Sequence, residues 1–245
     1  MTDVPVIPRP RWCVRAAGTF ELTPATAAAG DPSFVRQLRA ALGPATGFAF
    51  ADGDSHAITG RVDPHRLPDV AGAYRLDVSP DRVEVVGRDP AGLFYGLQTF
   101  RQLLPPESFQ TRPAAGVAWR VPCLRIEDAP RFQWRGVMLD CSRHFFDAEA
   151  VKAFIDALSL HKFNVFHWHL TDDQGWRLQI KKYPRLTDVG AWRPQTVIGH
   201  ALDRPARFDG VRYGPRLAFR CVLVRYGRIA SLHRPEDGSF VTASS

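Results

Sequence analysis

The sequence predicts an α+β N-terminal domain followed by the opening of a parallel α/β unit. Before about residue 125, two amphipathic helical patterns occur among strand-like segments. From Trp134 to Trp192 the pattern is strand, helix, strand, with polar side chains gathered just after each strand. Such a unit opens either an α/β barrel or a doubly wound sheet.

The N-terminal domain is expected to begin with a strand over 12–22 and a helix that starts at Asp31-Pro32. Aspartate caps a helix N-terminus, and proline fits the first helical position. We expect this helix to end at Gly43, because glycine tolerates the left-handed conformation that ends many helices. Its apolar face consists of Val35, Leu38 and Leu42.

A hairpin and a second helix are expected to follow. Residues 74–78 and 83–85 alternate apolar and polar side chains around a turn at 79–81, which is typical of an antiparallel hairpin. The second helix is expected to stop at Pro105, which cannot continue it. Its apolar face consists of Leu93, Leu97, Phe100 and Leu104.

A linker over 106–130 with one short strand candidate, 121–126, leads into the second region. We place the domain boundary within 128–131. The expected division of the chain is 1–128, 129–214 and a tail over 215–245.

Two buried strands and an intervening helix are expected after this boundary. Residues 137–139 and 164–170 are apolar runs, as in strands buried on both faces. Asp147 is placed to cap the helix between them, and a crossover helix makes the two strands parallel. The apolar face of this helix consists of Val151, Phe154, Ile155 and Leu158.

Polar and aromatic side chains follow both predicted strands. Arg143 and His144 come after the first, and Asp172, Asp173 and Trp176 come after the second. Because the carboxyl ends of adjacent parallel strands lie side by side, we expect these groups to share one rim. Cations, carboxylates and aromatic rings on one rim favour a site for a polyhydroxylated ligand.

Arg143 and Asp172 also have a purely structural interpretation as an ion pair. From the residue pattern alone this interpretation is the better one, although a paired arginine keeps further donors for a ligand. Asp140 lies within the first strand and is expected to bond a neighbour, because an unpaired buried carboxylate is costly.

His167 and His169 alternate on one face of the second strand. With aspartates nearby they suggest a metal site, but no third or fourth ligand stands out. We expect their rings to fill the interior instead. Trp176 is expected to pack in the core rather than to stack on a sugar.

Composition and charge limit the function classes. The chain has 245 residues, 45% of them hydrophobic and 23% charged, which is ordinary for a globular protein. The net charge of +7 suggests nucleic-acid binding, but no basic stripe or motif supports that reading. No apolar run is long enough to span a membrane, so neither nucleic acid nor membrane is an expected partner. All basic residues other than His are Arg except Lys152, Lys162, Lys181 and Lys182, a bias typical of GC-rich coding.

The four cysteines are far apart and form no C-x-x-C motif, which argues against a zinc site and gives no disulfide framework. Cys141 is expected to be a small buried hydrophobic side chain. The cysteines are Cys13, Cys123, Cys141 and Cys221.

At the strand–helix–strand segment the chain resembles a known family. MLDCSRHFF followed by HKFNVFHWHLTDDQGWR resembles glycoside hydrolase family 20, the β-N-acetylhexosaminidases. Upstream, AGLFYGLQTFRQLLP resembles the end of the small domain that precedes the catalytic (β/α)₈ TIM barrel of this family. The resemblance covers about residues 5–214. A full barrel needs about 250 residues, so the chain is expected to supply an incomplete barrel, its first two or three βα units.

The resemblance implies an activity and its groups. Family members remove terminal N-acetylglucosamine or N-acetylgalactosamine from glycans, and the substrate's own acetamido oxygen attacks the anomeric carbon. An adjacent Asp-Glu pair orients the acetamido group and protonates the leaving oxygen. By resemblance, Arg143 binds sugar hydroxyls, Asp172 is a supporting carboxylate, and neither a metal nor a cofactor takes part.

The chain departs from the family pattern in two ways. No Asp is followed directly by Glu, so the catalytic pair is absent, and the later aromatic residues of the sugar pocket are missing. After residue 214 the segment lacks a helix cap and a sustained helical period, which favours a reading-frame shift or premature end over a genuine alternative C-terminus. We therefore expect the chain to be inactive alone.

Three functions remain open at this point. The chain is a hexosaminidase fragment, a non-catalytic carbohydrate-binding protein that uses Arg143 and Asp172, or a structural partner whose open barrel edge is completed by a second chain. The N-terminus lacks a basic-then-apolar signal pattern. A cytoplasmic location is expected from the sequence as it stands, although proteins of this family are often secreted or periplasmic.

Overall fold

The computed structural model describes residues 4–199 and 204–212. The chain divides into two compact units, Met1–Gln133 and Trp134–Ser245. The predicted tail, 215–245, and Cys221 lie outside the described residues.

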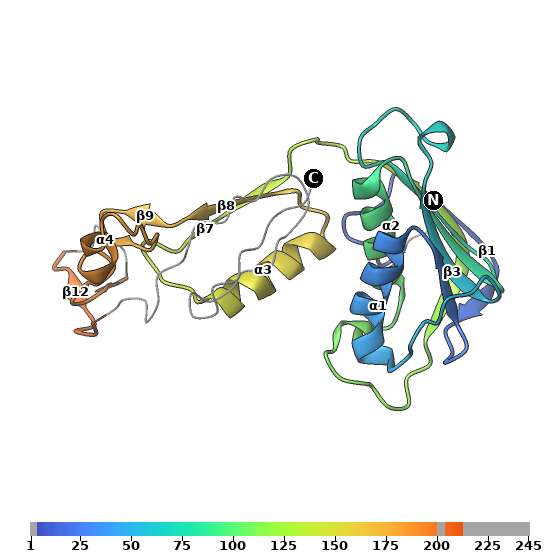
Figure 1. Ribbon diagram of the computed structural model, residues 1–245, viewed down its shortest axis with the longest axis horizontal. Helices are drawn as coiled ribbons and strands as arrows, with labels where there is room; N and C mark the ends of the chain where they lie inside the picture. The colour runs from blue at the N-terminus through green and yellow to red at the C-terminus, as the bar shows by residue number, and fades with distance from the viewer. Residues whose placement is uncertain (1–3, 200–203, 213–245) are drawn as a thin grey trace. The chain divides into compact units, whose positions relative to one another are not determined.

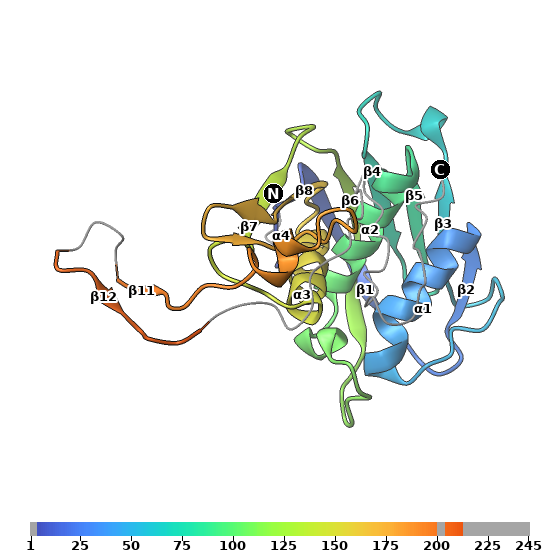
Figure 2. The ribbon, with the colours of Figure 1, turned by 60° about the vertical axis from the view of Figure 1, so that its left-hand side comes forward.

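The first unit is a six-stranded mixed sheet with two helices against one face (Figures 1 and 2). The strand order is β1-β6-β4-β5-β3-β2; β5, β3 and β2 run parallel, and the other pairs are antiparallel. The strands are β1 (Trp12–Glu21), β2 (Ala27–Gly30), β3 (Ala57–Val62), β4 (Tyr74–Val78), β5 (Arg82–Gly87) and β6 (Arg120–Asp128). The predicted hairpin of β4 and β5 is confirmed, with Val78 opposite Val83.

Helix α1 (Pro32–Thr46) begins where the sequence predicts. Asp31 caps it, its side chain accepting from the Ser33 N–H at 2.8 Å. The prediction that it ends at Gly43 is wrong. The left-handed residue is Gly47, with φ 72°, and its N–H bonds the Gly43 carbonyl at 2.8 Å, so the helix continues one turn further.

Helix α2 (Pro90–Leu103) is capped by Asp89 and ends just before Pro105, as predicted. It lies close to the sheet, since a Cβ on Gly96 would come within 2.4 Å of the Val85 side chain. Two short 3₁₀ helices, η1 (Pro64–Arg66) and η2 (Pro106–Phe109), complete the unit.

The core of this unit fills the layer between helices and sheet. Tyr74 is one of its buried residues with a polar group, 1% exposed, and its hydroxyl lies 2.6 Å from Thr99 Oγ1 and 3.0 Å from Asp128 Oδ2. Burial, followed by the negative charge of Asp128, raises the pKa of Tyr74. These bonds tie β4 to α2 and to the end of β6. The largest fully buried apolar side chains include Phe20, Phe34, Phe50, Phe100 and Leu38.

The second unit opens with the predicted strand–helix–strand. Strand β7 (Gly136–Asp140) and strand β8 (Val165–His169) pair in parallel, and α3 (Ala148–Leu160) joins them. Asp147 caps α3, its side chain accepting from the Ala150 N–H at 2.8 Å. The predicted parallel arrangement is therefore confirmed. A small core of Cys141, Val151 and Ile155 lies between the helix and the strands.

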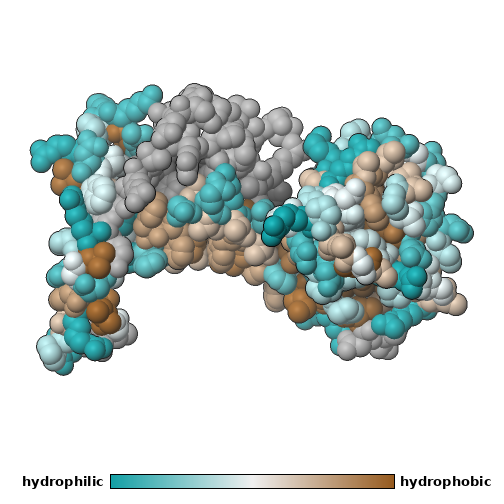
Figure 3. Space-filling model, turned by 90° about the horizontal axis from the view of Figure 1, so that it is seen from below, coloured by the Kyte–Doolittle hydropathy of each residue, from teal (hydrophilic) through white to brown (hydrophobic). Residues whose placement is uncertain are grey.

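Within the described residues, β7 and β8 pair only with each other. Met138 on β7 is consequently 51% exposed, so the expectation that both strands are buried on both faces is wrong within the described residues. Figure 3 shows apolar (brown) side chains on one face of the surface. The remaining elements are short: β9 (Thr171–Asp172), β10 (Gly175–Trp176), α4 (Arg185–Asp188), β11 (Val197–Ile198) and β12 (Arg207–Phe208). Across the described ranges, no helix has the length and hydropathy to cross a bilayer.

The Tyr74 hydroxyl gives a direct test of the core of the first unit. Tyr74→Phe keeps the ring but removes the bonds to Thr99 and Asp128. We expect the free energy of unfolding to fall by about 1–3 kcal/mol, because buried partners lose their bonds. Urea unfolding of the full chain measures this, with Tyr183→Phe at a 55% exposed position as the control. Equal unfolding midpoints for both variants would contradict the assigned role of Tyr74.

Candidate functional site

The ends of β7 and β8 bring Arg143 and Asp172 together. Arg143 follows β7, and Asp172 lies in β9, which directly follows β8. The parallel register sets Asp140 opposite His169, so both strands finish at the same level. Arg143 Nη2 lies 2.9 Å from Asp172 Oδ2. The two residues predicted to share a rim are therefore in direct contact.

Three side chains fix the guanidinium of Arg143. Besides Asp172, its Nη1 lies 2.9 Å from Asp140 Oδ2, and its Nε donates to Gln174 Oε1 at 2.8 Å. A guanidinium has five N–H groups, so two remain beyond these three contacts among the described residues. The side chain is 48% exposed. The plane is thus held in place while part of it faces solvent.

Asp140 organises the turn that carries Arg143. Its Oδ1 accepts from the backbone N–H groups of Ser142 and Arg143, both at 3.0 Å. The expectation that this strand carboxylate bonds a neighbour is confirmed. One carboxylate therefore shapes the turn with one oxygen and holds the guanidinium with the other.

Asp172 is held by a two-residue turn between β9 and β10. Asp172 pairs with Gly175 across this hairpin, and its Oδ1 accepts from the Asp173 N–H at 2.9 Å. Its Oδ2 contacts both Arg143 and His169 Nε2, the latter at 3.0 Å. Aspartate is favoured here because it bonds the backbone of its own turn.

Both carboxylates are stabilised in their charged form. The Asp173 N–H is the main cause of the lowered pKa of Asp172, with Arg143 and His169 adding to it. Partial burial opposes ionisation of Asp140, but bonds from Arg143 and Ser142 outweigh it and lower its pKa. Asp140 in turn raises the pKa of Arg143. The cluster is therefore one cation held between two anions.

A buried arginine holds the backbone that carries this cluster. Arg177 is fully buried, and it donates to the carbonyls of Cys141 and Ser142, each at 3.1 Å, and to that of Ala191. Burial, together with the positive charge of Arg193, lowers the pKa of Arg177. These bonds hold the backbone just before Arg143.

The other predicted residues lie nearby in different roles. His167 is exposed, so the prediction that both rings fill an interior is wrong for it, because no described strand covers that side of β8. Its ring stacks on His169 with centroids 6.1 Å apart. Trp176 is partly buried and donates from Nε1 to the Leu178 carbonyl at 2.6 Å. His144 packs edge-on against Phe146.

Cys141 has no exposed surface and accepts from Trp168 Nε1 at 3.1 Å. Burial raises the pKa of its thiol, in keeping with its predicted role as a buried apolar side chain. Among the described residues, no three or more His, Cys, Asp or Glu side chains are grouped to hold a metal ion.

Two members of the cluster were not found from the sequence. Gln174 sits in the turn after Asp172, within the TDDQGW motif, and that position was the available signal. Arg177 carried no such signal, because its partners are backbone carbonyls. Chemically, the cluster offers fixed N–H donors beside carboxylate acceptors, a combination suited to vicinal hydroxyls.

Two family models cover most of the chain. Glycosyl hydrolase family 20, domain 2, matches residues 3–129, and the catalytic domain of the same family matches residues 132–215. The Arg143 cluster lies within the second match.

Individual relatives agree with these models. A β-N-acetylhexosaminidase from Cellulomonas fimi is 38% identical over 78% of this chain and 39% of its own length. A β-hexosaminidase from Vibrio furnissii is 47% identical over 50% of this chain and 19% of its own. The structure of a mutant Streptomyces plicatus β-hexosaminidase in complex with its product GlcNAc matches with TM-score 0.70 and 39% identity, covering 80% of this chain and 40% of that one. The chain thus spans less than half the length of each relative.

The lowered pKa values predict that acid opens the cluster. When the pKa of a carboxyl is lower in the folded chain than in the unfolded chain, its charged form stabilises the fold. This contribution is fully present at pH values above the unfolded pKa, which is near 3.8 here. This stability is lost as the pH falls through the folded value. We therefore expect the Nη–H chemical shifts of Arg143 to stay constant down to about pH 4 and to move towards those of a free arginine below it. The signal is assigned by its loss in Arg143→Lys, and the signal of the exposed Arg36 is the control. A chemical shift of Arg143 that stays constant at every pH would contradict its pairing with Asp140 and Asp172.

Proposed function

Because the chain belongs to glycosyl hydrolase family 20, we propose that it functions as a β-N-acetylhexosaminidase, a glycosidase that releases terminal N-acetylhexosamine from glycans. The observation that carries this proposal is the contact between Arg143 and Asp172 at the ends of β7 and β8, inside the catalytic-domain match. On this proposal β7, α3 and β8 are the first βα unit of a (β/α)₈ barrel, whose active groups gather at the carboxyl ends of its strands.

The geometry of the cluster supports sugar binding. Arg143 is held in one plane by Asp140, Asp172 and Gln174, so few of its rotamers are lost when a ligand binds. Its remaining N–H groups can donate to two neighbouring hydroxyls, and Asp172 can accept from a third. The Streptomyces plicatus relative holds GlcNAc, which makes N-acetylglucosamine the first ligand to test here.

Catalysis needs groups that these 245 residues do not contain. The substrate-assisted mechanism uses an Asp-Glu pair, and no such dipeptide occurs in the sequence. Asp172 and Asp173 are adjacent carboxylates, but Asp172 is already paired with Arg143 and His169 and its pKa is lowered, which is opposite to the requirement for a general acid.

A second candidate function is that of a carbohydrate-binding protein without turnover, which the fixed and half-exposed guanidinium of Arg143 also supports. Both candidates use the same sugar contacts at Arg143 and Asp172. They differ in whether the bound glycosidic bond is cleaved.

The first test compares binding with turnover. The full chain is expected to bind methyl N-acetyl-β-glucosaminide, observed by saturation-transfer NMR, yet to leave p-nitrophenyl N-acetyl-β-glucosaminide intact. Loss of the general acid alone lowers the rate of hydrolysis by about 10²–10⁴-fold. Hydrolytic activity that copurifies with the protein would show that another side chain acts as the general acid. Absence of binding would overturn the proposed site.

The second test addresses the guanidinium plane. Arg143→Lys keeps the charge but loses the planar set of donors, and we expect sugar binding to weaken about tenfold or more. Gln174→Met removes the acceptor of the Arg143 Nε–H and is expected to weaken binding several-fold. Gln179→Met, at another exposed position three residues after β10 ends, is the matched control. Equal dissociation constants for the Gln174 and Gln179 variants would mean that the bond from Arg143 to Gln174 does not contribute to sugar binding.

A further inference from the structure

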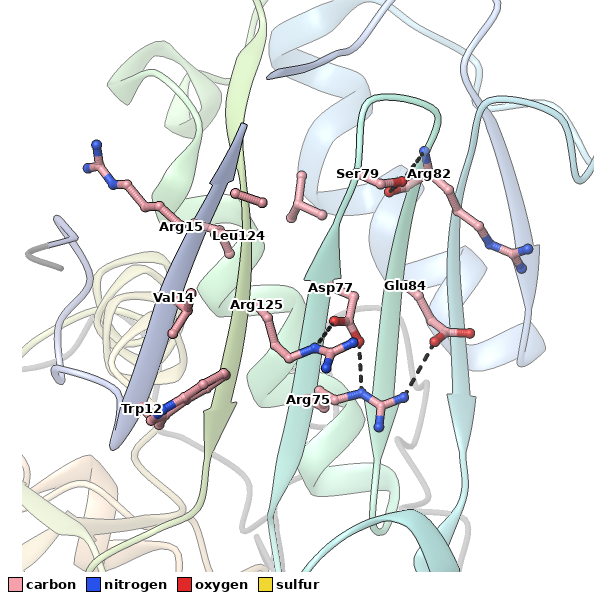
Figure 4. Close-up of a pocket in the computed structure, with 12 residues that line it drawn as sticks. Trp12, Val14, Arg15, Arg75, Asp77, Ser79, Arg82, Glu84, Leu124 and Arg125 are labelled. Atoms are coloured by element: carbon pink, nitrogen blue, oxygen red, sulfur yellow. Dashed lines mark hydrogen bonds and ion pairs between the residues drawn. The ribbon is translucent and has the colours of Figure 1, made fainter. Parts of the chain in front are cut away.

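The sheet of the first unit has an open face opposite its helices, and this face holds a hollow of about 570 Å³. Figure 4 looks onto it, with the helices behind the strands. Side chains from β1, β4, β5 and β6 line the hollow, among them Trp12, Val14, Arg75, Asp77, Glu84 and Arg125. We call it the open-face hollow.

The charged groups in the open-face hollow differ in their exposure to solvent. Asp77 and Glu84 are each only 24% exposed, whereas the Arg125 side chain is 55% exposed. Arg75 lies between the two carboxylates, with Nε 2.7 Å from Asp77 and Nη2 3.6 Å from Glu84. Arg125 pairs with Asp77 from the other side. The carboxylates are thus partly covered, and the guanidinium groups are fixed in orientation.

The lining carries an excess of positive charge. Four arginines and two carboxylates line the hollow, and Arg15 and Arg82 on its rim are exposed. Arginine presents a planar set of donors that matches a carboxylate or a similar planar anion. The partner that complements this surface therefore carries negative charge.

One side of the hollow is apolar. Trp12 is 43% exposed and Val14 is 46% exposed on β1, and Leu124 forms part of the buried floor. An exposed indole beside fixed polar groups gives one apolar contact surface and several hydrogen-bonding groups. The apolar C–H face and the hydroxyls of a sugar ring match that combination.

We propose that the open-face hollow binds an oligosaccharide segment that carries carboxylate groups. Its carboxylates contact the exposed arginines, one ring lies on Trp12, and Asp77 and Glu84 accept bonds from its hydroxyls. A single-stranded DNA is a poorer match, because its backbone offers no hydroxyl to these two carboxylates. This site belongs to the first unit and does not depend on Arg143.

Binding to the full chain is measured by calorimetry with three probes: a hyaluronan octasaccharide, neutral chitohexaose and an eight-residue oligothymidylate. The hyaluronan fragment is expected to bind most tightly. Arg82→Ser is expected to weaken its binding at least about fivefold, because it removes one charge-assisted contact. Trp12→Ala should weaken it several-fold. Arg36→Ser, at an exposed position on α1 across the sheet, removes the same charge and is expected to leave binding unchanged.

Several results would overturn the proposal. Equal binding of chitohexaose would remove the role of charge, and equal or tighter binding of the oligothymidylate would make the surface a general polyanion site. A loss in Arg36→Ser as large as in Arg82→Ser would assign binding to net charge alone. Arg143→Lys leaves this site intact, so failure of the sugar cluster at β7 and β8 is distinguishable from failure of the open-face hollow.

Discussion

The parallel register between β7 and β8 is the constraint on which the candidate site depends. It sets Asp140 opposite His169, and the segments that continue from these two residues carry Arg143 and Asp172. A slip of one residue between the two strands would shift Asp172 relative to Arg143 and break the ion pair that joins the two strand ends. The apolar face of α3 fixes this register by packing Val151 and Ile155 against the strands.

The two faces of the N-terminal sheet show how one alternating pattern serves two purposes. In β4 the buried residues Tyr74, Leu76 and Val78 face the helices, and the intervening Arg75 and Asp77 face solvent. Burial of the first set stabilises the fold, while ion pairing keeps the second set in fixed orientations. An ion-paired surface contributes little to stability by itself.

The sequence predicted local features well, because each has a local cause. Asp31 and Asp147 cap helices through bonds to residues two or three positions away, and the rim contact of Arg143 with Asp172 follows from parallel strands. The end of α1 was misplaced because either Gly43 or Gly47 satisfies the same local rule. The strand order of the first unit was not predictable, since β1 pairs with β6 across about a hundred residues of chain. Strand β2 gave no signal, being Ala-Ala-Ala-Gly.

The bonds of Arg177 also determine when the site can form during synthesis of the chain. Its side chain bonds carbonyls 36 and 35 residues before it and one 14 residues after it. During synthesis the backbone at Cys141 and Ser142 therefore cannot gain these bonds until the chain has been extended through Arg177. Residues are added at about 5–20 per second, so the growing chain spends on the order of a second with β7, α3 and β8 present but this backbone unsupported. A chaperone or a sugar that acts in that interval meets a sheet without its finished rim.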